Sequence, residues 1–157
     1  MIRAFAFGVA LIGSAAAYAA PASQFLSDAI KGDNSEVRLG QLIATRGHSP
    51  EVRRFGNTLV EDHSEARVQA SAVARQMHAS VPGTMMAEAQ SEYHKLQRLH
   101  GHAFDREVRR YMINDHQKDI AEFRSQARDG DRKTAALASA QLPTLRKHLR
   151  IAKSLPQ

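Results

Sequence analysis

The sequence predicts an all-α protein: an antiparallel bundle of four main helices plus a short extra helix. Good helix formers such as alanine, leucine, arginine and glutamine are abundant along its 157 residues, and β-branched residues are few. No stretch alternates apolar and polar residues for long enough to predict a strand. Instead, apolar residues recur at steps of three and four, which places them on one face of a helix.

The amino-terminal residues 1–19 have the pattern of a cleaved signal peptide. Arg3 supplies one positive charge, the run that follows is almost wholly apolar, and small residues at Ala17 and Ala19 suit a signal peptidase. We therefore expect cleavage after Ala19 and a single bundle domain over residues 20–157. The apolar run is shorter than the ~20 residues that a transmembrane helix needs, and no later segment approaches that length.

An export signal predicts a periplasmic address, with secretion as the alternative. The chain has no cysteine, which excludes disulfide bonds, cysteine-ligated metals and a lipid-modified cysteine. The formal charge of +6 becomes +5 when Arg3 is removed, so an anionic envelope component is a candidate partner. Nucleic acid is not expected as a partner, because the chain has no tryptophan and few aromatic residues among its basic ones.

The first helix is expected over residues 23–45, with an inner face of Phe25, Ala29, Glu36, Gly40 and Ile43. Residues 32–35, Gly-Asp-Asn-Ser, weaken its middle and favour a bend there. The second helix is expected from Pro50 to about residue 79, because Ser49 can cap it and proline fits its first turn. Its inner stripe is Val52, Gly56, Leu59, His63, Ala66, Ala70, Val73 and Met77. In that stripe only His63 is polar.

Three more helices follow. A short polar one is expected over residues 84–99, a longer one over 104–128, and the last over 132–154, where Pro143 favours a kink or a restart. The inner face of the fourth helix is Val108, Met112, His116, Ile120, Phe123 and Ala127, and that of the last is Leu142, Leu145, His148, Leu149, Ala152 and Leu155.

Glu36, His63, His116 and His148 therefore each lie on the inner stripe of a different long helix. A buried polar group is costly unless it has a partner, so we expect the four side chains to converge inside the bundle. Three imidazoles and one carboxylate can hold one divalent metal ion, such as zinc, copper or iron. The alternative is a hydrogen-bond network that holds the helices in register.

Two acidic residues immediately precede histidines of this group. Asp62 and Asp115 lie about 100° around the helix from the histidines that follow them, too far to share their faces easily. We expect them to orient partners on neighbouring helices instead.

At these positions the chain resembles an exported bacterial family, domain of unknown function 4142, of the ferritin-like superfamily. The resemblance rests on the order and spacing of Phe25-Leu26, Glu36, Gly40, Val52-Arg53-Arg54-Phe55, Val60-Glu61-Asp62-His63, Gly101, Phe104-Asp105, Asp115-His116, Leu142-Pro143 and His148-Leu149. It implies a ferritin-like bundle and no established activity. A full di-iron centre is not expected, because the Glu-x-x-His motifs are missing: Val60 and Ile113 stand where the glutamates would be.

The sequence leaves two classes of function open, and neither is an enzyme. It has no nucleophile elbow, no glycine-rich phosphate loop and no His-Glu-x-x-His motif, so no catalytic residues are assigned. In the first class, the protein binds a divalent metal ion or serves in envelope stress. In the second, it is a noncatalytic structural or interaction module whose histidine and glutamate cluster only stabilises the core.

Overall fold

The computed structural model describes residues 20–156 and contains five α-helices in this range, with no strand. They are α1 (Ala22–Arg46), α2 (Pro50–Gln76), α3 (Ala87–Gln97), α4 (Gly101–Asp129) and α5 (Arg132–Ser154). The expected helices agree with these to within about one turn, so the all-α prediction is confirmed. The predicted signal peptide and its cleavage site lie outside the described residues.

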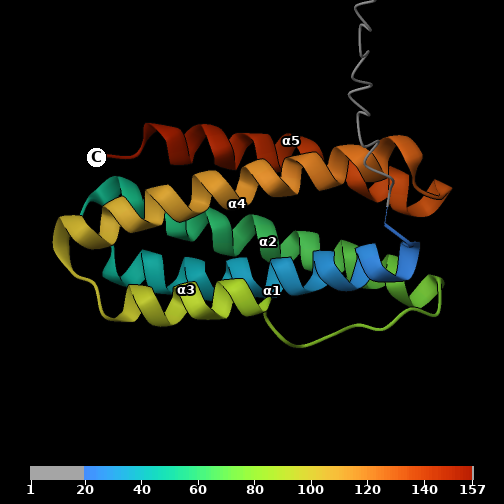
Figure 1. Ribbon diagram of the computed structural model, residues 1–157, viewed down its shortest axis with the longest axis horizontal. Helices are drawn as coiled ribbons and strands as arrows, with labels where there is room; N and C mark the ends of the chain where they lie inside the picture. Colours follow the sequence, from blue (N-terminus) through green and yellow to red (C-terminus); the bar gives the residue numbers. More distant parts are fainter. Residues whose placement is uncertain (1–19, 157) are drawn as a thin grey trace, which may run out of the picture.

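The bundle consists of two antiparallel helical hairpins and one short helix (Figure 1). α1 packs along α2, α4 packs along α5, and the two hairpins meet mainly where α2 contacts α5. α3 contacts both α1 and α4, and it covers only the half of the bundle where α1 ends and α4 begins (Figure 1). Beyond α3, α1 and α4 therefore face each other without a helix over them.

The first hairpin is tight because its helices approach backbone to backbone. A Cβ atom added at Gly56 would lie 2.4 Å from the backbone nitrogen of Ala44 and 2.7 Å from the carbonyl oxygen of Gly40. Only glycine permits this contact. As expected, Ser49 caps α2, since its hydroxyl oxygen accepts from the backbone N–H of Val52 at 3.3 Å.

Residues 32–35 do not interrupt α1, which is one continuous helix. Their polar side chains hold the segment before α3 instead. The Asn34 amide donates to the carbonyl oxygens of Pro82 (3.0 Å) and Thr84 (3.1 Å), and the Ser35 hydroxyl accepts from the backbone N–H of Met86 (2.9 Å). These tertiary hydrogen bonds thus keep residues 32–35 in the helix, although their intrinsic helix propensity is low. α5 likewise runs through Pro143 as one helix.

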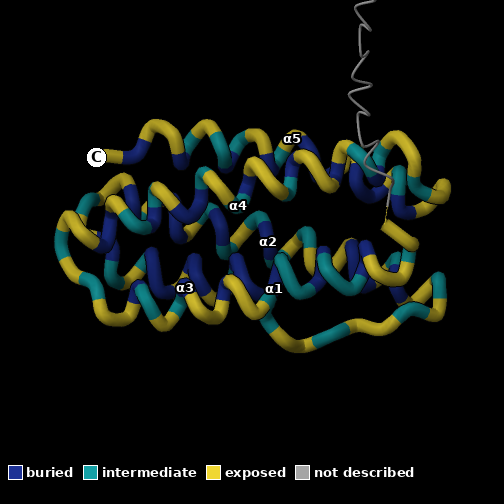
Figure 2. Tube along the Cα trace, in the orientation of Figure 1, coloured by how far each residue is buried: buried dark blue, intermediate teal, exposed yellow. Residues whose placement is uncertain are grey.

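The core has two apolar clusters with a polar layer between them. The first cluster, under α3, includes Leu39, Phe55 and Phe104; the second, at the far half, includes Phe25, Ala70 and Phe123. The layer between them contains buried polar side chains from all four long helices: Asp33, Asn34, Ser35, Glu36, His63, His116 and His148. Figure 2 shows that buried positions line the inner side of every long helix. Within residues 20–156, no helix is both long and apolar enough to cross a membrane.

Candidate metal centre

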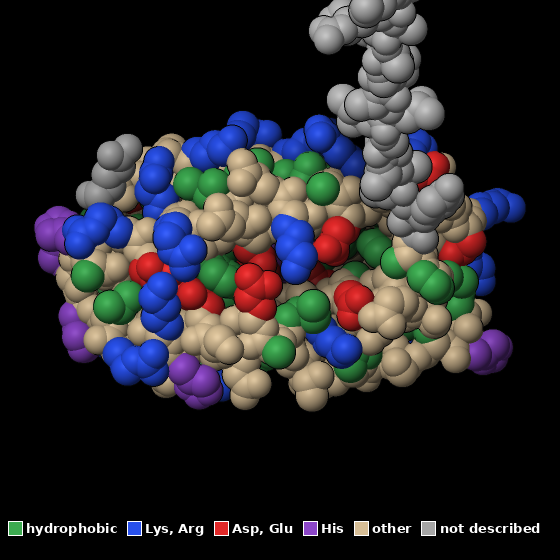
Figure 3. Space-filling model, in the orientation of Figure 1, with side chains coloured by type: hydrophobic (Ala, Val, Ile, Leu, Met, Phe, Trp, Pro, Cys, Tyr) green, Lys and Arg blue, Asp and Glu red, His purple; other side chains and the backbone are tan. Residues whose placement is uncertain are grey.

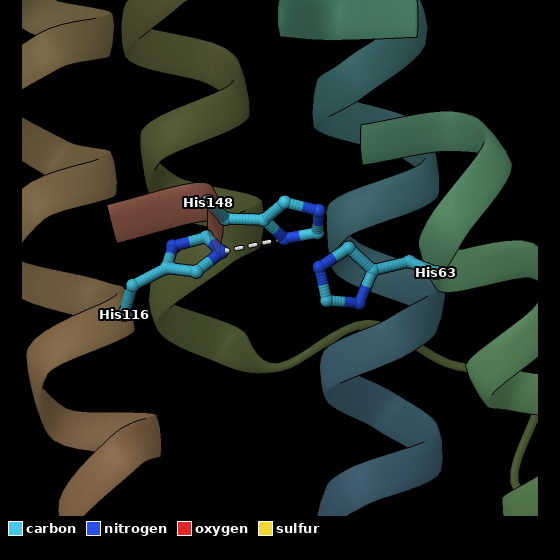
Figure 4. A group of neighbouring side chains, drawn as sticks. All are labelled: His63, His116 and His148. Atoms are coloured by element: carbon cyan, nitrogen blue, oxygen red, sulfur yellow. Dashed lines mark hydrogen bonds between the residues drawn. The ribbon is translucent and has the colours of Figure 1, made fainter. Parts of the chain in front are cut away.

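Three of the four predicted side chains meet in the polar layer. His63 from α2, His116 from α4 and His148 from α5 each contribute one ring nitrogen to a group whose atoms all lie within 4.8 Å of one another (Figure 4). Their residues are 4%, 0% and 0% exposed. Helical periodicity turns each ring inward, and the packing of α2 against α5 and of α4 against α5 brings the rings together.

The outer ring nitrogen of His148 is held by a carboxylate. Its Nε2 donates to Oδ2 of Asp62 at 2.7 Å, and the same oxygen accepts from the Lys147 ammonium at 2.5 Å. Burial raises the pKa of Asp62, but the hydrogen bonds from Lys147 and His148 outweigh that effect, so the net pKa is lowered. The prediction that Asp62 orients a partner on a neighbouring helix is confirmed.

The other two histidines are held in the same way. Nδ1 of His63 donates to Oδ1 of Asp33 at 2.9 Å, and both side chains are buried. Nδ1 of His116 donates to the main-chain carbonyl oxygen of Met112, one turn earlier on α4, at 3.0 Å. Each imidazole therefore has an oxygen acceptor on its outer side.

These acceptors determine where the imidazole protons lie. A neutral imidazole has one N–H, and here the acceptors take it at Nδ1 of His63, Nδ1 of His116 and Nε2 of His148. The inner nitrogens, which are Nε2 of His63, Nε2 of His116 and Nδ1 of His148, then carry lone pairs. Nε2 of His63 is buried with no hydrogen-bond partner among the described residues.

The rings of His116 and His148 are neutral at neutral pH. Burial lowers the pKa of His116 well below its ordinary value, and the neighbouring His63 and His148 lower it further. Burial, together with His63, lowers the pKa of His148 to about 4, although Asp62 opposes this. The contact between Nε2 of His116 and Nδ1 of His148 at 3.3 Å, dashed in Figure 4, therefore brings two lone pairs together.

This arrangement could hold a metal ion. A tetrahedral ion bound at ~2.0 to 2.1 Å holds neighbouring nitrogens about 3.3 to 3.4 Å apart. The inner nitrogens of His116 and His148 are already 3.3 Å apart. The ligand nitrogen of His63 lies within 4.8 Å of these two, and three imidazoles leave one coordination position of a tetrahedral ion for a further ligand.

Glu36, the fourth predicted side chain, lies in the same layer but outside the three-histidine group. Its carboxyl group hydrogen-bonds with that of Asp115, and it is 2% exposed. Burial raises the pKa of Glu36 well above its ordinary value, and the charges of Asp115 and Asp119 raise it further. The pair holds a proton, as two adjacent carboxyl groups must when no cation lies between them. Asp115 thus contacts α1, a neighbouring helix, as expected.

A cavity of about 760 Å³ lies between α1 and α4, has further walls from α2 and α5, and reaches this layer. Glu36, Asp33, Asp62 and His63 line it, whereas His116 and His148 do not. Of the three histidines, His63 is therefore the one that borders the cavity.

Comparison with known proteins places the chain in a family. A family model described as "Domain of unknown function (DUF4142)" matches residues 10–155. The chain belongs to the DUF4142 family. The crystal structure of a DUF305 fragment from Deinococcus radiodurans has a similar fold, with a TM-score of 0.73 and 19% sequence identity over 87% of this chain and 95% of that chain. No curated protein matches.

The description of the DUF4142 family names no ligand for this site. The sequence did not predict Asp33 as the partner of His63, because Asp33 lies in the Gly-Asp-Asn-Ser segment that favours a bend. A signal for it exists: Asp33 precedes Glu36 by three residues and so shares the inner face of α1.

Proposed function

We propose that this protein binds a single divalent transition-metal ion through His63, His116 and His148. The observation that carries the proposal is the set of three inner nitrogens with lone pairs, each produced by an outer hydrogen bond to Asp33, Asp62 or the Met112 carbonyl. Metal-ligating histidines have this second set of partners almost without exception, since it selects the tautomer and holds the ring in place.

A metal ion accounts for the layer better than a closed hydrogen-bond network does. In a network, Nε2 of His63 is left buried without a partner, and His116 and His148 have no proton to share at 3.3 Å. Each such unpaired group costs about 1 to 3 kcal/mol. One cation at the centre pairs all three nitrogens at once.

The ligand chemistry favours zinc, copper(II) or iron. Neutral imidazoles suit these borderline ions, and the chain offers no thiolate for softer ones. The signal-peptide pattern of residues 1–19 supports export to the periplasm. We therefore propose a periplasmic protein that sequesters or senses a metal ion.

Metal titration of residues 20–157, prepared without a histidine tag and freed of metal, tests the proposal. Calorimetry and elemental analysis should give one tightly held ion per chain for zinc or copper(II). His63→Ala and His116→Ala should each weaken binding at least 100-fold. Asp33→Ala, which removes only the outer hydrogen-bond partner of His63, should weaken it about 10- to 100-fold.

His94→Ala is the matched control, because His94 is exposed on α3 and hydrogen-bonds only to Gln97. Its affinity for metal should equal that of the wild type. A folded wild-type protein that retains no stoichiometric ion, or equal binding by the His63 and His94 variants, would contradict the proposal and favour the structural network.

A further inference from the structure

The cavity between α1 and α4 is acidic in a protein whose overall charge is positive. Nine of the sixteen acidic residues of the chain line it, with Lys118 as its one Lys or Arg lining residue. Figure 3 shows acidic side chains along the middle of this face, with lysine and arginine side chains above and below them. Such a charge distribution attracts cations into the hollow and repels them from the surrounding surface.

Several of these acidic groups are already neutralised. Asp62 pairs with Lys147, Glu88 with Lys118 at 3.6 Å, and Asp28 with Lys31 at 3.8 Å. These three acids already have a cation beside them, so they do not require one from a ligand.

Six of the nine lining acids have no ion pair to lysine or arginine in the described part of the chain. Two of these six have other partners, because Asp33 accepts from His63 and Glu65 accepts from Gln69. The other four are Glu36, Asp115, Asp119 and Glu122. Glu36 is the strongest evidence for a ligand. It is 2% exposed and lines the cavity, and its Oε2 is buried with no hydrogen-bond partner among residues 20–156. A buried carboxylate oxygen with no donor is rare in proteins, so an external donor is expected there.

The four groups also repel one another. Burial raises the pKa of Asp119 well above its ordinary value, and the charges of Asp115 and Glu122 raise it further. Burial raises the pKa of Glu122 as well. A ligand that brings positive charge into the cavity relieves both the burial cost and the repulsion.

The size and the other walls of the cavity indicate an organic cation. Its volume of about 760 Å³ is in the range of small-molecule sites, roughly 300 to 1,000 Å³, and far exceeds the space of one ion. Phe25, Tyr111 and Phe123 line it together with several alanines. Aromatic and methyl surfaces suit alkyl chains, and the faces of aromatic rings attract ammonium groups.

The acidic groups follow a line. Asp115, Asp119 and Glu122 lie at steps of four and three on one face of α4, which spans about 10 Å of helix. Glu36 faces the first of them from α1. Positive charges separated by short apolar spacers would match this line, whereas a compact cation would meet only one end of it.

We propose that the α1–α4 cavity binds a linear aliphatic polyamine, with one ammonium group between Glu36 and Asp115 and another at Asp119 and Glu122. This site adjoins the three-histidine centre, because His63 lines the same cavity, but its proposed contacts are carboxyl groups and do not depend on a bound metal.

Calorimetric titration of the metal-free protein with spermidine tests the proposal. We expect one molecule per chain. Asp115→Asn and Asp119→Asn should each weaken binding at least tenfold, because each removes a charge while keeping the shape of the side chain. Glu61→Gln, on the exposed side of α2, should leave the affinity unchanged. Circular dichroism of each variant should show the helical spectrum of the wild type, which controls for loss of folding.

The outcomes separate this proposal from that for the metal centre. His116→Ala should lose the metal and still bind spermidine. Equal weakening by the Glu61, Asp115 and Asp119 substitutions would show unspecific attraction and overturn the polyamine site. A protein that does not bind spermidine would also overturn the polyamine proposal. If Mn²⁺ or Ca²⁺ binds instead, and Asp115→Asn abolishes that binding, the cavity is an inorganic cation site.

Discussion

Replacing His148 by glutamine should remove an acid-sensitive part of the stability of the metal-free protein. His148 is fully buried, and burial together with His63 lowers its pKa in the folded state to about 4, from 6.5 in the unfolded chain. The folded state therefore binds its proton less readily than the unfolded state does. The stability linked to His148 is complete above about pH 6.5 and is lost as the pH falls towards 4.

The size of this contribution to stability follows from the difference between the folded and unfolded pKa of His148. At about 1.4 kcal/mol per tenfold change in proton affinity, the lowering from 6.5 to about 4 is worth roughly 3 kcal/mol. Between pH 7.5 and pH 5, about 2 kcal/mol of this is lost. Glutamine does not titrate, and its amide can still donate to Asp62, so His148→Gln isolates the protonation effect.

Urea unfolding measures this loss of stability. The wild type and His148→Gln are each unfolded at pH 7.5 and at pH 5, with a chelator present. The free energy of unfolding of the variant, relative to the wild type, should rise by about 2 kcal/mol at the lower pH. His94→Gln, at an exposed site, should show no such change. A difference between wild type and His148→Gln that is the same at both pH values would refute the conclusion that the core holds this imidazole neutral.

Three further predictions concern stability. Asp119→Asn should raise the melting temperature at pH 7.5 and not at pH 4. Burial raises the pKa of Asp119, so the wild type loses stability as the pH rises and this side chain must ionise. A variant with a lower melting temperature than the wild type at pH 7.5 would contradict this reasoning. Gly56→Ala should lower the free energy of unfolding by about 1 to 3 kcal/mol in urea, since its Cβ would meet the backbone of Ala44 at 2.4 Å, whereas Gly83→Ala, with open space around it, should not. Asp105→Ala should cost about 3 kcal/mol in the same assay, because its buried carboxylate accepts two backbone N–H groups of the α1–α2 turn at 2.8 Å; a loss well below 1 kcal/mol would show that water replaces it.

The sequence by itself determined the helices and the direction in which their side chains point. Apolar spacing and local signals such as Ser49 and Pro50 are properties of neighbouring residues, so they placed the helix ends to within about a turn. The same periodicity turned His63, His116 and His148 inward, and the structure confirms that these three side chains are buried.

Only the tertiary structure decided which inward groups meet. Helical periodicity gives the direction of a side chain around its own helix, but not the rotation or the height of one helix relative to another. Glu36 therefore lies against Asp115 and outside the histidine group, and Asp33, from a segment that locally favours a bend, becomes the partner of His63. The acidic cavity depends on the same packing, because residues about 80 positions apart on α1 and α4 form its walls only when the two hairpins are docked.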